Sequence, residues 1–212
     1  MKLTIILILI NVIIFFLTII YGLNYSVNEF GFKPSSFLQG KVYTIVTSLF
    51  MHASIEHIFF NMVALFLLGT SLEKKVSKWK YLLVYFLGGI IGNIVMLIPF
   101  LYSPDTIGVG ASGAISALVG LGAFICPDKL VIFPSVIPLP FVVAGVLYFL
   151  ITVSNILVPS DYQVGYPVHM IGIIVGSIFG LVWSENWKRS LLIFIVTLIL
   201  ILLLPYILDL IF

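Results

Sequence analysis

A serine and two histidines stand near the starts of apolar segments in a chain with few other polar groups. Ser112 lies in a Gly-Ala-Ser-Gly sequence at 110–113, and His57 and His169 each precede an apolar stretch. Hydroxyl and imidazole groups are costly in a bilayer, so each needs a partner or a function. A serine hydroxyl becomes a useful nucleophile when a neighbouring base accepts its proton. The sequence therefore predicts nucleophilic catalysis by Ser112, with His169 as the base.

Groups that could stabilise an oxyanion stand close to the same residues. The first N–H groups of a helix lack intrahelical partners, so those of Ser112 and Gly113 are expected to be free donors. His57 and Asn61 are four residues apart and share a helix face, where they can offer an imidazole and an amide N–H. No acidic residue is expected at the depth of His169, so the prediction is a Ser–His dyad rather than a triad.

The composition indicates an integral membrane protein. Of the 212 residues, 62% are hydrophobic and 8% are charged, whereas a soluble domain carries about 25% charged residues. The chain has no basic patch interleaved with aromatic residues, so nucleic acid is not expected as a partner. The one cysteine, Cys126, allows no disulfide within the chain and no cysteine metal cluster.

The elements that must position these groups are membrane helices. The first is expected to be an uncleaved span, and the loop after it, long and apolar, to rest at the membrane interface. With the N-terminus in the cytoplasm, eight of the ten basic residues fall on the cytoplasmic side, as the positive-inside rule requires. The apolar runs predict seven spans: 3–21, 55–72, 81–101, 112–126, 136–158, 167–184 and 190–210.

Counting along the helices places the polar groups at one depth. At 1.5 Å per residue, Ser112, His169 and His57 lie about 21 Å from the inner ends of their spans, and Asn61 about 16 Å. The fourth span is too short to cross alone, so 103–111 must descend as irregular backbone, which is tolerated only within protein or beside a wet cavity. The count therefore predicts a cavity that opens to the outer side, with Ser112 at its floor.

Each of these residues also has a purely structural interpretation. A lone serine at a helix start is more often a cap, a lone histidine more often bonds a neighbouring backbone, and Asn61 alone could join two helices. The stripe of Gly172, Gly176 and Gly180 is the small-residue pattern of close helix packing. The shared depth on three helices is what favours a functional site.

Four motifs then make the pattern specific, and the chain resembles the rhomboid family of intramembrane serine proteases over roughly 40–184. Residues 110–113 look like the family's GxSG, and His169 begins a match to its HxxGxxxG. The segment 50–61 matches its H-x4-H-x3-N through His52, His57 and Asn61, and 68–73 fits LGxxLE. The chain departs from the family in two places. The first loop lacks a clear Trp-Arg pair, with Lys41-Val42-Tyr43 near where that pair is often seen, and Val168 precedes His169 where the family commonly has alanine.

The resemblance implies an all-α polytopic fold with a six-helix catalytic core at 1–184 and an extra C-terminal transmembrane helix at 185–212. It implies Ser112 as nucleophile, His169 as base, His57 and Asn61 as oxyanion-hole side chains, and His52, Gly110 and Gly172 as supporting residues. No metal or cofactor is required. Substrates would be transmembrane proteins cut near the outer face of a cell membrane, with 158–167 as a cap over the site.

Two other classes of function were weighed. A catalytically inactive, client-binding relative would be expected to lack the serine or the histidine, and both are present. A small transporter or channel with a broken helix at 103–112 would often show inverted repeats, and none is visible in the sequence. The oligomeric state is not readable from the sequence.

Overall fold

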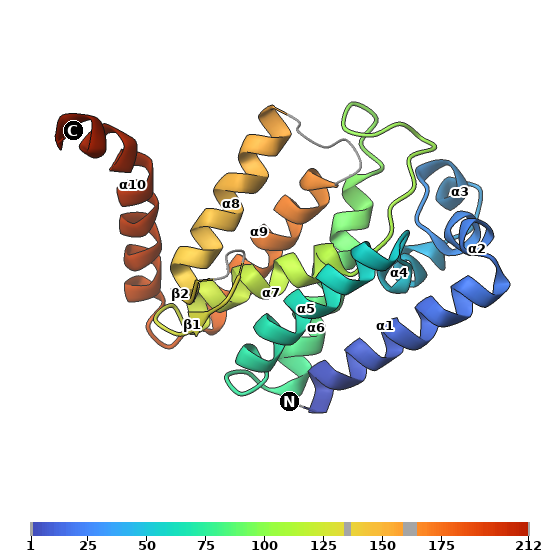
Figure 1. Ribbon diagram of the computed structural model, residues 1–212, viewed down its shortest axis with the longest axis horizontal. Helices are drawn as coiled ribbons and strands as arrows, with labels where there is room; N and C mark the ends of the chain where they lie inside the picture. Colours follow the sequence, from blue (N-terminus) through green and yellow to red (C-terminus); the bar gives the residue numbers. More distant parts are fainter. Residues whose placement is uncertain (1, 134–136, 159–164, 212) are drawn as a thin grey trace.

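The computed structural model describes residues 2–133, 137–158 and 165–211, which are mostly helical (Figure 1). Each of the seven expected spans coincides with one of its long helices. These are α1 (Lys2–Tyr21), α5 (Ile55–Leu72), α6 (Lys78–Val95), α7 (Ser112–Ile125), α8 (Phe141–Leu157), α9 (Tyr166–Trp183) and α10 (Trp187–Ile211).

The long first loop folds into short helices rather than extended chain. They are α2 (Leu23–Phe30), α3 (Pro34–Leu38), α4 (Thr44–Thr47) and the 3-10 turn η1 (Ser48–Phe50). Between α7 and α8, β1 (Leu130–Val131) pairs antiparallel with β2 (Leu139–Pro140). Lys41 and Tyr43, which stand in place of the family's Trp-Arg pair, both bind the carboxylate of Glu29, at 2.6 and 2.7 Å. This link fastens α2 to the segment before α4.

Two expected boundaries were wrong. The third span was predicted to reach residue 101, but α6 ends at Val95 and the chain continues as turns. Pro99 lacks an N–H and disfavours helix in the residue before it, which ends the helical pattern early. The fifth span was predicted from residue 136, but α8 begins at Phe141, because Leu139 and Pro140 pair with β1 instead.

Four of the described helices are long and apolar enough to cross a membrane, namely α1, α5, α9 and α10. α7 has 14 residues and α8 has 17, and both are apolar but shorter. The short α7 agrees with the expectation that the chain must reach Ser112 through non-helical backbone, which here follows α6. In Figure 1 the N-terminus and the α5–α6 and α9–α10 turns lie along one edge, opposite the loop that follows α6.

α7 is the centre of the fold. Every residue from Gly113 to Phe124 is buried, and α7 packs against α5, α6, α8 and α9. Glycines make this packing close: a side-chain carbon on Gly172 or Gly176 of α9 would collide with the backbone of α7. The glycine stripe seen in the sequence thus faces the helix that carries Ser112.

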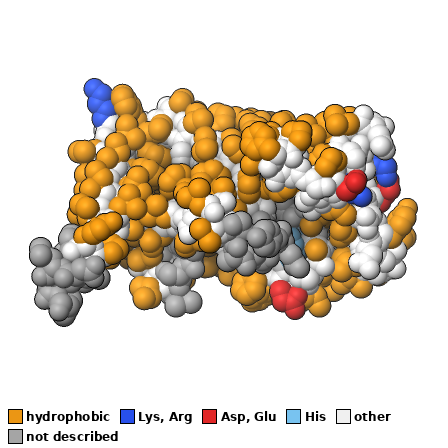
Figure 2. Space-filling model, turned by 90° about the horizontal axis from the view of Figure 1, so that it is seen from above, with side chains coloured by type: hydrophobic (Ala, Val, Ile, Leu, Met, Phe, Trp, Pro, Cys, Tyr) orange, Lys and Arg blue, Asp and Glu red, His pale blue; other side chains and the backbone are white. Residues whose placement is uncertain are grey.

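The outer surface is apolar, as a lipid-facing surface must be. Figure 2 shows hydrophobic side chains over most of the visible face, with the charged side chains few and near its edges. α1, α5 and α10 expose many isoleucine, leucine and phenylalanine side chains. In water such a surface would associate, whereas in a bilayer it meets acyl chains.

Candidate active site

Ser112 is the first residue of α7, and a glycine brings the chain to it. Gly110 has a φ of +112°, a conformation that residues with side chains rarely adopt. A side-chain carbon at Gly110 would also lie 2.7 Å from Nε2 of His57. Gly110 therefore permits both the turn into α7 and the approach of the His57 ring.

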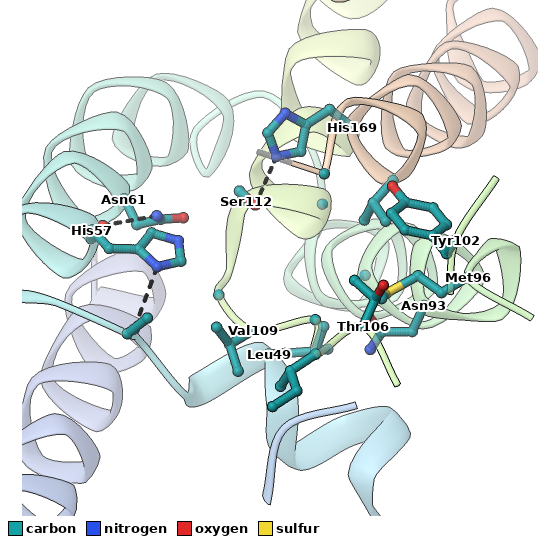
Figure 3. Close-up of a pocket in the computed structure, with 18 of the residues that line it drawn as sticks. Leu49, His57, Asn61, Asn93, Met96, Tyr102, Thr106, Val109, Ser112 and His169 are labelled. Atoms are coloured by element: carbon teal, nitrogen blue, oxygen red, sulfur yellow. Dashed lines mark hydrogen bonds between the residues drawn. The ribbon is translucent and has the colours of Figure 1, made fainter. Parts of the chain in front are cut away.

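His169 lies in the first turn of α9 and meets Ser112 directly. Its Nε2 is 2.8 Å from Ser112 Oγ (Figure 3). When the hydroxyl donates this bond, Nε2 carries no proton and Nδ1 does. A side-chain carbon on Gly113 would come within 3.0 Å of Val168, so this glycine lets the start of α9 approach.

His57 and Asn61 lie across the cavity from His169, on α5 (Figure 3). The Ser54 hydroxyl caps α5 by accepting from the His57 N–H at 3.1 Å. The Ala53 N–H reaches His57 Nδ1 at 3.5 Å, which makes Nδ1 the acceptor and leaves the proton on Nε2, beside Gly110. Asn61 Nδ2 donates to the His57 carbonyl at 2.9 Å, using one of its two N–H groups.

These four side chains line one cavity of about 580 Å³. The wall near Ser112 comes from α5, α7 and α9, and the wall farther away comes from η1, α6 and the loop after α6 (Figure 3). The residues that η1, α6 and the loop after α6 contribute to the wall are Leu49, Gly89, Asn93, Met96, Tyr102, Thr106, Ile107, Gly108 and Val109. The shared depth counted from the sequence thus corresponds to a common cavity.

Two of the predicted supporting residues lie outside the cavity wall. His52 is fully buried, with its ring edge-on to His57 at 5.1 Å between centroids. Gly172 lies one turn below His169, against α7. Their surroundings fit packing behind the site rather than contact with a bound molecule.

The first loop supports the segment that leads to Ser112. Phe32 and Gly108 exchange two backbone hydrogen bonds, of 2.9 and 2.7 Å, and the Gly110 N–H donates to the Ser48 carbonyl at 2.9 Å. Asn93 of α6 donates to the Ser48 hydroxyl at 2.8 Å and to the Ile45 carbonyl at 3.0 Å. Asn93 was missed from the sequence, although an amide within an apolar span is the same signal that singled out Asn61.

Two further expectations concern the cap over the site and the binding of a metal. Most of the expected cap, residues 159–164, lies outside the described residues, and its flanking Gly165 lines the cavity. Within the described part of the chain, no three His, Cys, Asp or Glu side chains gather as a metal site would require.

Comparison with known proteins matches the Rhomboid domain family to residues 39–186. The chain is 29% identical over 155 residues to RHOMBOID-like protein 12, mitochondrial, of Arabidopsis thaliana, covering 66% of this chain and 46% of that protein. It is 40% identical over 86 residues to Putative rhomboid protease YdcA of Bacillus subtilis (strain 168), covering 40% and 42%. Rhomboid protease GluP of the same organism is 37% identical over 92 residues, covering 43% and 17%. The chain thus spans less than half the length of each of these relatives.

Proposed function

This chain belongs to the rhomboid family, and from that premise we propose that it is an intramembrane serine endopeptidase with Ser112 as nucleophile and His169 as base. The observation that carries the proposal is the 2.8 Å separation of His169 Nε2 and Ser112 Oγ at the wall of the cavity. This contact supports an active protease over an inactive, client-binding relative.

The chemistry follows from the positions of the protons. Nε2 of His169 takes the hydroxyl proton as Ser112 Oγ attacks a peptide carbonyl, and the resulting imidazolium then protonates the leaving amine. The tetrahedral oxyanion takes hydrogen bonds from the backbone N–H groups of Ser112 and Gly113, from His57 Nε2–H and from the remaining N–H of Asn61. Water, activated by the same imidazole, hydrolyses the acyl-enzyme and restores Ser112.

The substrates we propose are transmembrane proteins whose helix unwinds near its outer end. An extended segment is needed because a helix hides its peptide carbonyls in its own hydrogen bonds. The proposal includes a cytoplasmic N-terminus, a six-helix core at 1–184 with α10 as a seventh span, and a place in a cell membrane. The distribution of basic residues supports this orientation.

A fluorophosphonate probe, which reacts with activated serines, tests the nucleophile. We expect labelling of the purified wild-type protein and none of Ser112→Ala, while Ser71→Ala at the far end of α5 is labelled like the wild type. Equal labelling of the wild type and Ser112→Ala would remove Ser112 from the mechanism.

A membrane-anchored reporter tests the base. We expect cells that produce the wild type to cleave the reporter. Cells that produce the same amount of His169→Ala should not cleave it. Cleavage retained by His169→Ala would exclude His169 as the general base.

A further inference from the structure

Tyr148 of α8 lies beside the imidazole of His169. The two ring centroids are 6.3 Å apart with the planes tilted by 30°, within the range of offset aromatic pairs. The ring of Phe133 packs edge-on against Tyr148, with the centroids 5.2 Å apart. The tyrosine ring thus packs against both Phe133 and the imidazole of the proposed base.

The hydroxyl of Tyr148 also connects to the residue that carries the nucleophile. Ser116 Oγ donates to the carbonyl of Ser112 at 2.7 Å and lies 3.0 Å from Tyr148 Oη. A serine hydroxyl has one proton, and here it is used on the carbonyl. Tyr148 must therefore be the donor to Ser116, which ties its ring to the first turn of α7.

His169 needs support of this kind. No carboxylate among the described residues bonds its imidazole, so none of these residues plays the part of the third member of a triad. Tyr166 packs edge-on to the same ring at 6.0 Å, but it belongs to α9 and moves together with His169. Tyr148 is the neighbouring ring that relates the imidazole to a different helix and, through Ser116, to Ser112 itself.

We propose that Tyr148 is a positioning residue, which holds the His169 imidazole in line with Ser112 Oγ through its ring and its hydrogen bond to Ser116. The inference rests on the proposed function, because it assumes that the Ser112–His169 pair reacts. It assigns to α8 a part in aligning two groups that lie on α7 and α9.

The test measures the rate of fluorophosphonate labelling of the purified full chain at several probe concentrations. This gives two quantities: the limiting rate constant at saturating probe, and the probe concentration at which half of that rate is reached. Tyr148→Leu is expected to lower the limiting rate constant about 10- to 100-fold, the usual effect of a misplaced catalytic group. The half-saturating probe concentration should change less than about twofold, because the cavity that admits the probe is kept. Tyr81→Leu is the control, since it removes a buried tyrosine ring on α6, away from the cavity.

Two conservative variants keep the test valid if Tyr148→Leu does not fold. Tyr148→Phe keeps the ring and removes only the bond to Ser116, so it should lower the limiting rate constant about fivefold. Ser116→Ala keeps the tyrosine but removes both this bond and the Ser116 bond to the Ser112 carbonyl, so its loss should be at least as large. The double variant should show the same loss as Ser116→Ala alone rather than the product of the two, because Tyr148→Phe then has no further bond to remove. Independent losses, or a wild-type rate constant in folded Tyr148→Leu or Tyr148→Phe, would overturn the inference. Equal labelling of the wild type and Ser112→Ala is a different result, and it would overturn the proposed function itself.

Discussion

The side-chain amide of Asn61 has two N–H groups, one with a structural role and one available for the proposed chemistry. One N–H of Nδ2 is used on the His57 carbonyl, which helps to hold the His57–Asn61 turn of α5. The other remains for a molecule in the cavity that Asn61 lines. Asn28 of α2 makes the same bond to the carbonyl four residues earlier, at 2.9 Å, but outside the cavity.

The first prediction separates these two uses of the asparagine amide. Asn61→Ala should lower the fluorophosphonate labelling rate about 100-fold, since one oxyanion donor is lost. Asn28→Ala removes the same kind of helix bond and should leave the rate unchanged. A wild-type labelling rate in Asn61→Ala would exclude Asn61 as an oxyanion donor.

The second prediction concerns Gly110, where both the backbone conformation and the lack of space disfavour a side chain. Gly110→Ala should lose labelling, because the new carbon meets the His57 ring and strains a backbone with φ of +112°. Gly40 is the matched control, with φ of +103° and no atom within 4 Å of an added carbon. Gly40→Ala should cost about 1–2 kcal/mol of stability, measured by thermal unfolding, and keep labelling. Loss of labelling in both variants would assign the effect to strain alone.

At this scale the sequence predicted the residues but not their supports. The depth count brought Ser112, His169, His57 and Asn61 together because helix rise is fixed, and all four line the cavity. Tyr148 could not be recognised, since a tyrosine in an apolar span has no distinctive spacing. Whether Tyr148 meets His169 depends on which face of α8 is turned towards α9. The sequence pattern does not predict this face, because nearly all faces of α8 are apolar.

At the scale of elements, α1 is fixed at its start by the end of α5. The carboxylate of Glu73 accepts from the backbone N–H groups of Leu3 and Thr4, at 2.8 and 3.1 Å, and from the Thr4 hydroxyl at 2.9 Å. Gly69 leaves room for this contact, because a side-chain carbon there would meet Thr4 at 2.7 Å. The pair of residues that fits the family's LGxxLE thus docks one helix on another.

The third prediction uses the ionisation of Glu73. Burial alone would raise its pKa, but a hydrogen bond from the N-terminal amino group, together with those from Leu3 and Thr4, outweighs this and lowers the pKa to about 2. The carboxylate therefore stabilises the fold above its ordinary pKa of 4.5, and this stabilisation is lost as the pH falls towards about 2. Glu73→Gln should cost about 1 kcal/mol at pH 7, as expected for a charge at a helix start, and less at pH 3.

Thermal unfolding of the detergent-solubilised protein at both pH values measures this difference. Glu185→Gln removes an exposed carboxylate and should leave the unfolding temperature nearly unchanged at either pH. A difference between Glu73→Gln and the wild type that is equal at pH 7 and pH 3 would contradict the assigned role of the charge.

Element types were predictable from the sequence, and element ends were less so. Long apolar runs gave all seven long helices, since such runs are helical in a membrane. The end of α6 and the start of α8 depended on Pro99 and on the pairing of β1 with β2. The short helices of the first loop were missed because their apolar residues follow tertiary contacts, such as the Phe32–Gly108 bridge, rather than a helical period.

At the scale of the whole molecule, the two terminal helices are attached to very different extents. In α1, 28% of the membrane-spanning window is buried, and in α10 only 6%. α10 packs against α7, α8 and α9, and Phe194 of α10 stacks on Phe124 of α7, with centroids 5.1 Å apart. The family match ends at residue 186, just before α10 begins.

The fourth prediction follows from this asymmetry. A variant that lacks 187–212 should insert into the membrane and keep fluorophosphonate labelling within about threefold of the full chain, because the residues that line the cavity and their supports lie before Trp187. Its unfolding temperature should fall slightly, since Phe124 loses the stacking of one aromatic pair, worth about 1 kcal/mol. A variant that lacks 1–21 should lose labelling, because α5 and η1 lose the packing of α1 and Glu73 loses its bonds to Leu3 and Thr4. If removal of 187–212 abolished labelling of protein that is still inserted, α10 would be part of the catalytic unit and the division at residue 184 would be wrong.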